Sequence, residues 1–172
     1  MFHPPGPKVG WSLLLLGAFK IPRHRFILWF AILEKLATLD KPWLHHLCSS
    51  CVLCSTADLE SHEHLFFSCP LASNCLCEVQ RLVRFHWPNC NWVTVVHWVS
   101  RRWRGKHVVN ASFRALLASL VYHVWWGANA RIFRHTSRTP LDIASVVVNE
   151  IRELIISKEL PHTVSSRGLY RL

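Results

Sequence analysis

One group of cysteine and histidine residues has the spacing of a metal site. Two residues separate Cys51 from Cys54 and four separate His64 from Cys69, which gives the pattern C-x2-C-x9-H-x4-C. Zinc takes four such ligands in a tetrahedral array, and a closed set of cysteine and histidine leaves no position for a reactive water. The pattern therefore predicts one structural Zn²⁺ bound by Cys51, Cys54, His64 and Cys69.

Neighbouring residues offer other registers for this site. Cys48 also precedes a cysteine by two residues, and His62 supplies a second histidine. Cys48 also begins an iron–sulfur pattern with the next two cysteines, but in that pattern three residues separate the third cysteine from the fourth. Here fourteen residues separate Cys54 from Cys69. We therefore favour the zinc register.

The number of cysteines indicates the cellular compartment in which the protein occurs. The chain has seven cysteines, an odd number, and we find no secretory signal in it, which favours a reducing compartment. We expect an intracellular protein, nuclear or cytoplasmic, with Cys75, Cys77 and Cys90 buried as small hydrophobic residues. The apolar run at 13–19 is too short to span a bilayer, and 115–130 is expected to be a buried helix, so no membrane partner is predicted.

Apolar residues recur at helical spacing outside this region. With 172 residues, 51% of them hydrophobic, the chain can bury one core. The pattern predicts an all-α fold, a small helical domain with an inserted CCHC zinc knuckle. Helices are expected at 24–38, 42–47, 70–85, 92–103, 110 or 112 to 133, and 140–158. The zinc-binding domain would span 11–134 with its knuckle at 48–70, between a disordered lead-in at 1–10 and a C-terminal helix and frayed tail at 135–172.

Positive charge is concentrated in the C-terminal part. The net charge is +10, and residues 101–172 hold 12 basic and 4 acidic side chains, a balance of +8. Eight basic residues and no acidic one lie between Arg101 and Arg138. A basic surface with an interleaved aromatic ring is typical of nucleic-acid binding. The first part of this segment predicts a site for RNA or DNA, formed by Arg101, Arg102, Trp103, Arg104 and Lys106.

In that site the basic side chains would neutralise phosphates, and Trp103 would stack on a base. The alternative is a solvated helix end and loop, with Trp125 and Trp126 in the core. The knuckle has the opposite charge, because it contains Asp58, Glu60 and Glu63 and no Lys or Arg. We therefore expect the metal to fold its segment rather than to contact nucleic acid.

The knuckle and two other stretches resemble a known family. They are similar to the zinc-binding domain that follows the reverse transcriptase in plant non-LTR (LINE-type) retrotransposons. The likeness covers roughly residues 11–134 and rests on 21–29 (IPRHRFILW) with 36–40 (LATLD), on Cys51-Val-Leu-Cys54 with 60–70 (ESHEHLFFSCP), and on 125–133 (WWGANARIF). The chain departs from the family at Leu76 and Cys77, where a tryptophan is usual, and at Ala128, where arginine is usual.

The resemblance implies an accessory module that helps a reverse transcriptase hold RNA or DNA, with the reverse transcriptase domain of the parent polyprotein as a further partner. Polymerase activity does not carry over, because two-metal catalysis needs clustered carboxylates and the only aspartates are Asp40, Asp58 and Asp142. The chain is therefore predicted not to be an enzyme. The alternatives are a zinc-stabilised protein-docking module and a decayed retroelement fragment without a nucleic-acid role.

Overall fold

The computed structural model describes residues 11–15, 21–44, 46–47, 50–54, 56, 58–88 and 91–159. Helices make up its regular structure, and no strand forms in these residues, so the all-α prediction is confirmed. The α-helices are α1 (Ser12–Leu15), α2 (Pro22–Ile32), α3 (Pro70–Val83), α4 (Trp92–Arg102), α5 (Val108–Arg134) and α6 (Pro140–Glu159). Two shorter turns of other helix types are η1 (Pro42–Leu44) and η2 (His64–Ser68).

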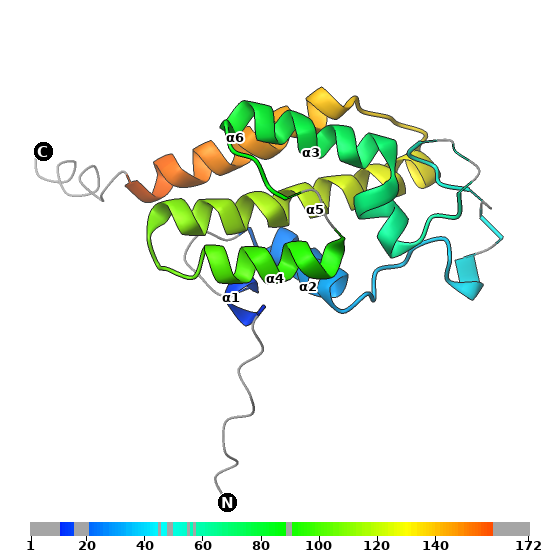
Figure 1. Cartoon of the computed structure of the whole chain (residues 1–172). Helices are drawn as coiled ribbons and strands as arrows, with labels where there is room; N and C mark the ends of the chain where they lie inside the picture. Colours follow the sequence, from blue (N-terminus) through cyan, green and yellow to red (C-terminus); the bar gives the residue numbers. More distant parts are fainter. Residues whose placement is uncertain are drawn as a thin grey trace, which may run out of the picture.

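The longest helix, α5, is the centre of the fold. It packs against α2, α3 and α6, and α1 contacts both α2 and α4 (Figure 1). Other helices surround the middle of α5, which is therefore apolar on several faces. The buried residues there include Leu116, Leu117, Leu120, Val121 and Val124. No helix in the described part of the chain is both long and apolar enough to cross a membrane.

Local capping residues fix the starts of three helices where the sequence predicts them. Pro70 occupies the first turn of α3, where its missing N–H costs no hydrogen bond. The side chain of Asn91 accepts a hydrogen bond from the backbone of Thr94 at 3.0 Å and caps α4. At α6 the Thr139 hydroxyl accepts from the amide of Asp142, and the carboxylate of Asp142 accepts from the amide of Thr139, both at 3.1 Å.

Three predicted helix boundaries are wrong. The first helix ends at Ile32 rather than 38, because Glu34 adopts a left-handed conformation with φ 53° and the amide of the next residue bonds back to Phe30. The longest helix begins at 108, since the His107 ring accepts a hydrogen bond from the amide of Val109 at 3.3 Å. The short helix expected at 42–47 is a single 3₁₀ turn over 42–44.

The C-terminal helix belongs to the same core. Helix α6 packs against both α3 and α5, and its inner face is buried through Ile143, Ala144, Val147, Val148 and Ile151. The sequence alone placed this helix beyond the domain at 11–134. The predicted lead-in at 1–10 and the tail from 160 lie outside the described residues.

Candidate metal centre

Four side chains converge at the end of the bundle where α3 begins. The ligand atoms of Cys51, Cys54, His64 and Cys69 all lie within 4.8 Å of one another. The sulfurs of Cys51 and Cys69 are 4.0 Å apart, and Nε2 of His64 is 3.3 Å from the sulfur of Cys54. A tetrahedral zinc with bonds of about 2.0 to 2.3 Å separates its ligands by roughly 3.3 to 3.8 Å. The four residues can therefore form one zinc site.

Backbone hydrogen bonds hold the ligands in place. The amide of Cys51 donates to the carbonyl of Asp58 at 2.8 Å and closes the loop that carries the first two cysteines. His64 opens the π-type turn η2, and the amide of Cys69 donates to the carbonyl of His64 at 2.7 Å. Such turns are rare and occur mostly at functional sites. Here the wide turn brings the third and fourth ligands to the same side of the chain.

Groups around the ligands orient them. The second ring nitrogen of His64, Nδ1, lies 4.0 Å from a carboxylate oxygen of Asp58, and the hydroxyl of Thr56 is 2.9 Å from the sulfur of Cys54. Carboxylates behind a metal-bound histidine fix its ring orientation and tautomer. Asp58 is therefore placed to act on the His64 ring beside the site.

The two buried cysteines differ in acidity. The hydrogen bond between the thiols raises the pKa of Cys51, and burial adds to this effect. The same bond lowers the pKa of Cys69, and the backbone amides of Leu71 and Ala72 act in the same direction against burial. The thiolate is the form that binds a metal. The first turn of α3 therefore favours the ligand form of Cys69.

The competing registers find no support in the described residues. His62 turns away from the cluster, and its buried ring packs against Phe66 and Trp92, with ring centroids at 5.0 and 5.3 Å. Cys48 lies outside the described residues.

The other cysteines divide between core and surface. Cys75 is buried as predicted, and burial raises the pKa of its thiol to about 12. Cys77 is exposed, so its predicted burial is wrong. Both lie on α3, where two residues correspond to a rotation of about 200°. When Cys75 faces the core, Cys77 faces solvent. Cys90 lies outside the described residues.

An arginine of α5 anchors the knuckle to the bundle. A guanidinium nitrogen of Arg131 donates to the carbonyls of Val52 and Leu53, at 2.9 and 2.5 Å. The side chain of Leu53 is buried, and its Cδ2 would lie 4.0 Å from a Cβ placed on Gly127. The stretch 125–133 therefore holds the segment between the first two ligands. Sequence reasoning counted Arg131 only as a surface charge.

The turn at 36–40 is tied to the knuckle as well. The Thr38 hydroxyl donates to the Asp40 carboxylate, and the amide of Asp40 donates to the carbonyl of Glu60 at 3.0 Å. Burial raises the pKa of Glu60 to about 7, although the backbone amides of Val52 and Leu39 oppose it. These contacts join two motifs that are separated in the sequence.

Replacing Arg131 with alanine is expected to lower the free energy of unfolding by about 1.5 to 3 kcal/mol, because its charge-assisted bonds to two carbonyls are lost. Zinc should also leave the knuckle faster. Urea unfolding and the rate of zinc transfer to a chelator measure the two effects. Arg134→Ala is the matched control, because Arg134 is exposed one turn along α5. Equal effects in both variants would contradict the anchoring role.

The predicted nucleic-acid residues lie at the other end of α5. The side chains of Arg101, Arg102, Arg104 and Lys106, together named the basic loop, are exposed at the end of α4 and in the connection to α5. Helix α5 has 27 residues and is therefore about 40 Å long. The basic loop precedes its first turn, whereas the knuckle contacts its last turns, at the opposite end of the bundle (Figure 1).

The stacking role predicted for Trp103 is wrong. Only 2% of this residue is exposed, and its ring stacks on Phe113 at 4.5 Å with an interplanar angle of 10°. Trp87 and Trp98 contact the same ring edge-on. Arg114, 7% exposed, donates to the carbonyls of Trp103 and Gly105 and closes the loop from inside. Trp103 anchors the basic loop instead of presenting a ring to solvent.

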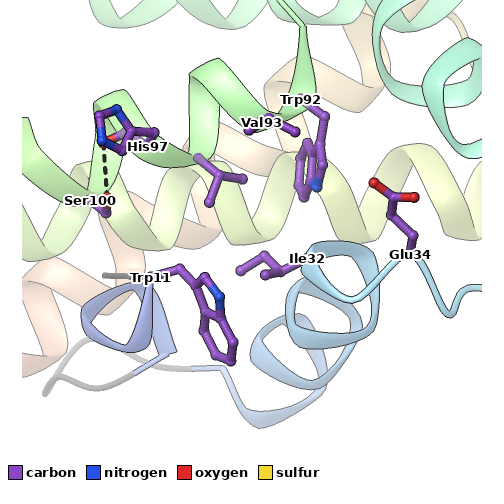
Figure 2. Close-up of a pocket in the computed structure, with 8 residues that line it drawn as sticks. Trp11, Ile32, Glu34, Trp92, Val93, His97 and Ser100 are labelled. Atoms are coloured by element: carbon purple, nitrogen blue, oxygen red, sulfur yellow. Dashed lines mark hydrogen bonds between the residues drawn. The ribbon is translucent and has the colours of Figure 1, made fainter. Parts of the chain in front are cut away.

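The pocket drawn in Figure 2 does not form an acid–base centre. It measures about 280 Å³ and lies between α2, α4 and the residues beside α1. Its lining includes one carboxylate, Glu34, and one imidazole, His97. Figure 2 shows these at opposite ends, with Trp92 and Val93 between them. The two groups therefore cannot act on one bond.

Comparison with known proteins agrees with the metal geometry. Residues 1–75 match the family model described as zinc-binding in reverse transcriptase. The match includes the four clustered residues and the turn at 36–40, and it ends within α3. No curated protein and no solved structure matches the chain. That family is described as zinc-binding and not as a catalytic polymerase domain, which agrees with the expectation that the chain has no polymerase activity. Zinc is therefore the cofactor indicated for this centre.

Proposed function

We propose that this chain is a structural zinc-binding accessory module of a reverse transcriptase from a plant non-LTR (LINE-type) retrotransposon. In this proposal zinc bound by Cys51, Cys54, His64 and Cys69 stabilises the fold, and the chain helps hold RNA or DNA without polymerase activity of its own. The observation that carries it is the convergence of four ligand atoms within 4.8 Å inside the region similar to a reverse-transcriptase zinc domain.

The charge distribution supports contact with a polyanion at the basic loop. Its four basic side chains are exposed, and no acidic residue lies between positions 101 and 138. The acidic knuckle is at the opposite end of α5, so its charge is several Debye lengths away at physiological salt. A phosphate backbone would therefore meet four exposed basic side chains at this end of the bundle.

A second candidate function is docking to a protein, with the reverse transcriptase domain of the parent polyprotein as the partner. The observation that favours it is an exposed aromatic group on α2, where Phe26 is 53% and Trp29 is 40% exposed and their rings contact each other at 6.2 Å. Adjacent exposed aromatic rings are typical of protein interfaces. Binding at this group would depend weakly on salt.

Nucleic-acid binding is tested by replacing all four residues of the basic loop with alanine. If each wild-type side chain neutralises one phosphate, the log–log slope of affinity against salt is about −3 on single strands and −4 on duplex. The variant should lose most of this slope and keep its zinc and helicity, because the four side chains are exposed and distant from the knuckle. Fluorescence anisotropy at several salt concentrations measures the slope.

The control for this experiment is a Lys35→Ala, Arg134→Ala double variant, because both side chains are exposed and lie outside the basic loop. It should keep the wild-type slope. If the wild-type chain binds neither RNA nor DNA at about 50 mM salt, where phosphate contacts are strong, the nucleic-acid role is wrong and the docking function takes its place.

A further inference from the structure

Three potential metal ligands meet in the helical bundle, far from the four-ligand centre. They are His24 of α2, His123 of α5 and Glu150 of α6, and their ligand atoms all lie within 4.8 Å of one another. Oε2 of Glu150 is 3.0 Å from Nε2 of His123 and 3.6 Å from Nε2 of His24. Ligands on a tetrahedral metal with bonds of about 2.0 to 2.1 Å are roughly 3.3 to 3.4 Å apart. The three atoms therefore need only a small adjustment to share one ion.

We propose that His24, His123 and Glu150 form a second metal site, for a divalent transition-metal ion such as Zn²⁺. Two imidazoles and one carboxylate suit zinc or ferrous iron, and this donor set leaves at least one coordination position for water or another ligand. The site joins α2, α5 and α6, so a bound ion would cross-link three helices of the core.

The environment of the histidines suits metal binding. His24 is 2% and His123 is 7% exposed, and the ring of Tyr122 covers His24 at a centroid distance of 4.4 Å. Burial lowers the pKa of His24 to about 4 and also lowers that of His123. Burial thus favours the neutral form of both imidazoles, which is the form that binds a metal. The side chain of Glu150 is 19% exposed and gives the site contact with solvent.

The carboxylate is held in a fixed orientation. Arg23 lies 3.3 Å from Oε1 of Glu150, and the hydroxyl of Ser119 donates to Oε2 at 2.8 Å. Such outer contacts orient a ligand toward its metal. They leave Oε2 facing the two imidazoles. Arg23 opposes cation binding through its positive charge and because its Nε donates to Nε2 of His24 at 3.4 Å, a hydrogen bond that a bound ion would have to replace. This ion should therefore exchange more readily than the one held by three cysteines.

The same contacts also fit a metal-free hydrogen-bond network, in which Glu150 accepts from His123 and Ser119. That alternative predicts that all three side chains stabilise the fold but that no metal binds. Metal binding to the zinc-loaded chain separates the two cases.

The test titrates Co²⁺ into the full chain after its cysteine site has been filled with Zn²⁺. The wild-type protein should bind one further equivalent without a thiolate-to-cobalt absorption band, and this equivalent should raise the unfolding temperature. Glu150→Gln keeps the side-chain size and a hydrogen-bond acceptor for Ser119, and it should weaken binding of the added ion by at least about 100-fold, since losing even an outer-shell partner costs 10 to 100-fold. Equilibrium dialysis with metal analysis measures the affinity.

The matched control is His97→Gln, which removes an exposed imidazole from α4 and should bind the added ion like wild type. If Glu150→Gln does not fold, cobalt-edge X-ray absorption on the unmodified chain tests the proposal instead. The spectrum should show two imidazoles and no sulfur around the added ion. The proposal is overturned if the zinc-loaded wild-type chain binds no further equivalent. It is also overturned if Glu150→Gln binds that equivalent unchanged, or if sulfur surrounds the cobalt.

Discussion

A Cys51→Ser protein is expected to lose the zinc that survives dialysis and to unfold between residues 50 and 70. Cys51 is one of the four clustered residues that could hold the metal, its side chain is buried, and its sulfur lies 4.0 Å from that of Cys69. Structural zinc contributes on the order of 10 kcal/mol in small domains, which is comparable to the whole stability of about 5 to 15 kcal/mol of an ordinary domain. Metal analysis after dialysis and limited proteolysis of the knuckle measure the two losses.

Cys77→Ser is the matched control, because it makes the same chemical change at an exposed thiol of α3. It should retain one tightly held zinc and the wild-type cleavage pattern. The helices α5 and α6 should remain largely helical even in Cys51→Ser, since their buried faces contact each other directly. Equal zinc in both variants would mean that a different set of ligands holds the metal.

The metal centre was predictable because its geometry is local. All four candidate ligands lie within residues 51–69, and their spacing is one that recurs in structural zinc sites. The contacts that hold this segment against the bundle were not predictable from spacing. Arg131 is 79 and 78 positions from the knuckle carbonyls that it binds, at 52 and 53, and a count of charges cannot distinguish a partly buried guanidinium from a solvated one.

Helix starts were likewise easier to predict from the sequence than helix ends. The start of α3 depends on Pro70, which suits a first turn, and the starts of α4 and α6 depend on the side chains of Asn91 and Thr139, which accept hydrogen bonds from the first turn. The sequence shows these residues directly. The end of α2 depends on Glu34 in a left-handed conformation, for which glycine is the usual signal. With no glycine there, periodicity extended the expected helix to 38.

The cluster of two histidines and one glutamate shows which contacts sequence periodicity does not predict. No local pattern connects His24, His123 and Glu150, which come from three different helices and meet only in the folded chain. The sequence therefore predicted a single metal ion. Aromatic residues pose the same difficulty, because a tryptophan among four basic residues matches a stacking site and a loop anchor equally well. Burial of the ring in the folded chain decides between them.

Trp103→Ala is therefore expected to destabilise the fold rather than to remove a stacking contact. The ring is 2% exposed and packs between Phe113, Trp98 and Trp87, and replacing a buried tryptophan with alanine costs about 3 to 5 kcal/mol. Urea unfolding of the zinc-loaded protein should report this loss. At a temperature where the variant is folded, its affinity for single-stranded RNA should stay close to wild type, because the basic loop remains charged.

Trp43→Ala is the control, because it removes the same ring from a position where the tryptophan is 66% exposed. Its unfolding free energy should change by no more than about 0.5 kcal/mol, as is usual for surface substitutions. A base stacked on Trp103 would give the opposite pattern, with binding weakened by about 1 to 3 kcal/mol and stability unchanged. That result would mean that the ring leaves the aromatic cluster in solution, and the basic loop would then be an aromatic and cationic nucleic-acid site rather than a purely cationic one.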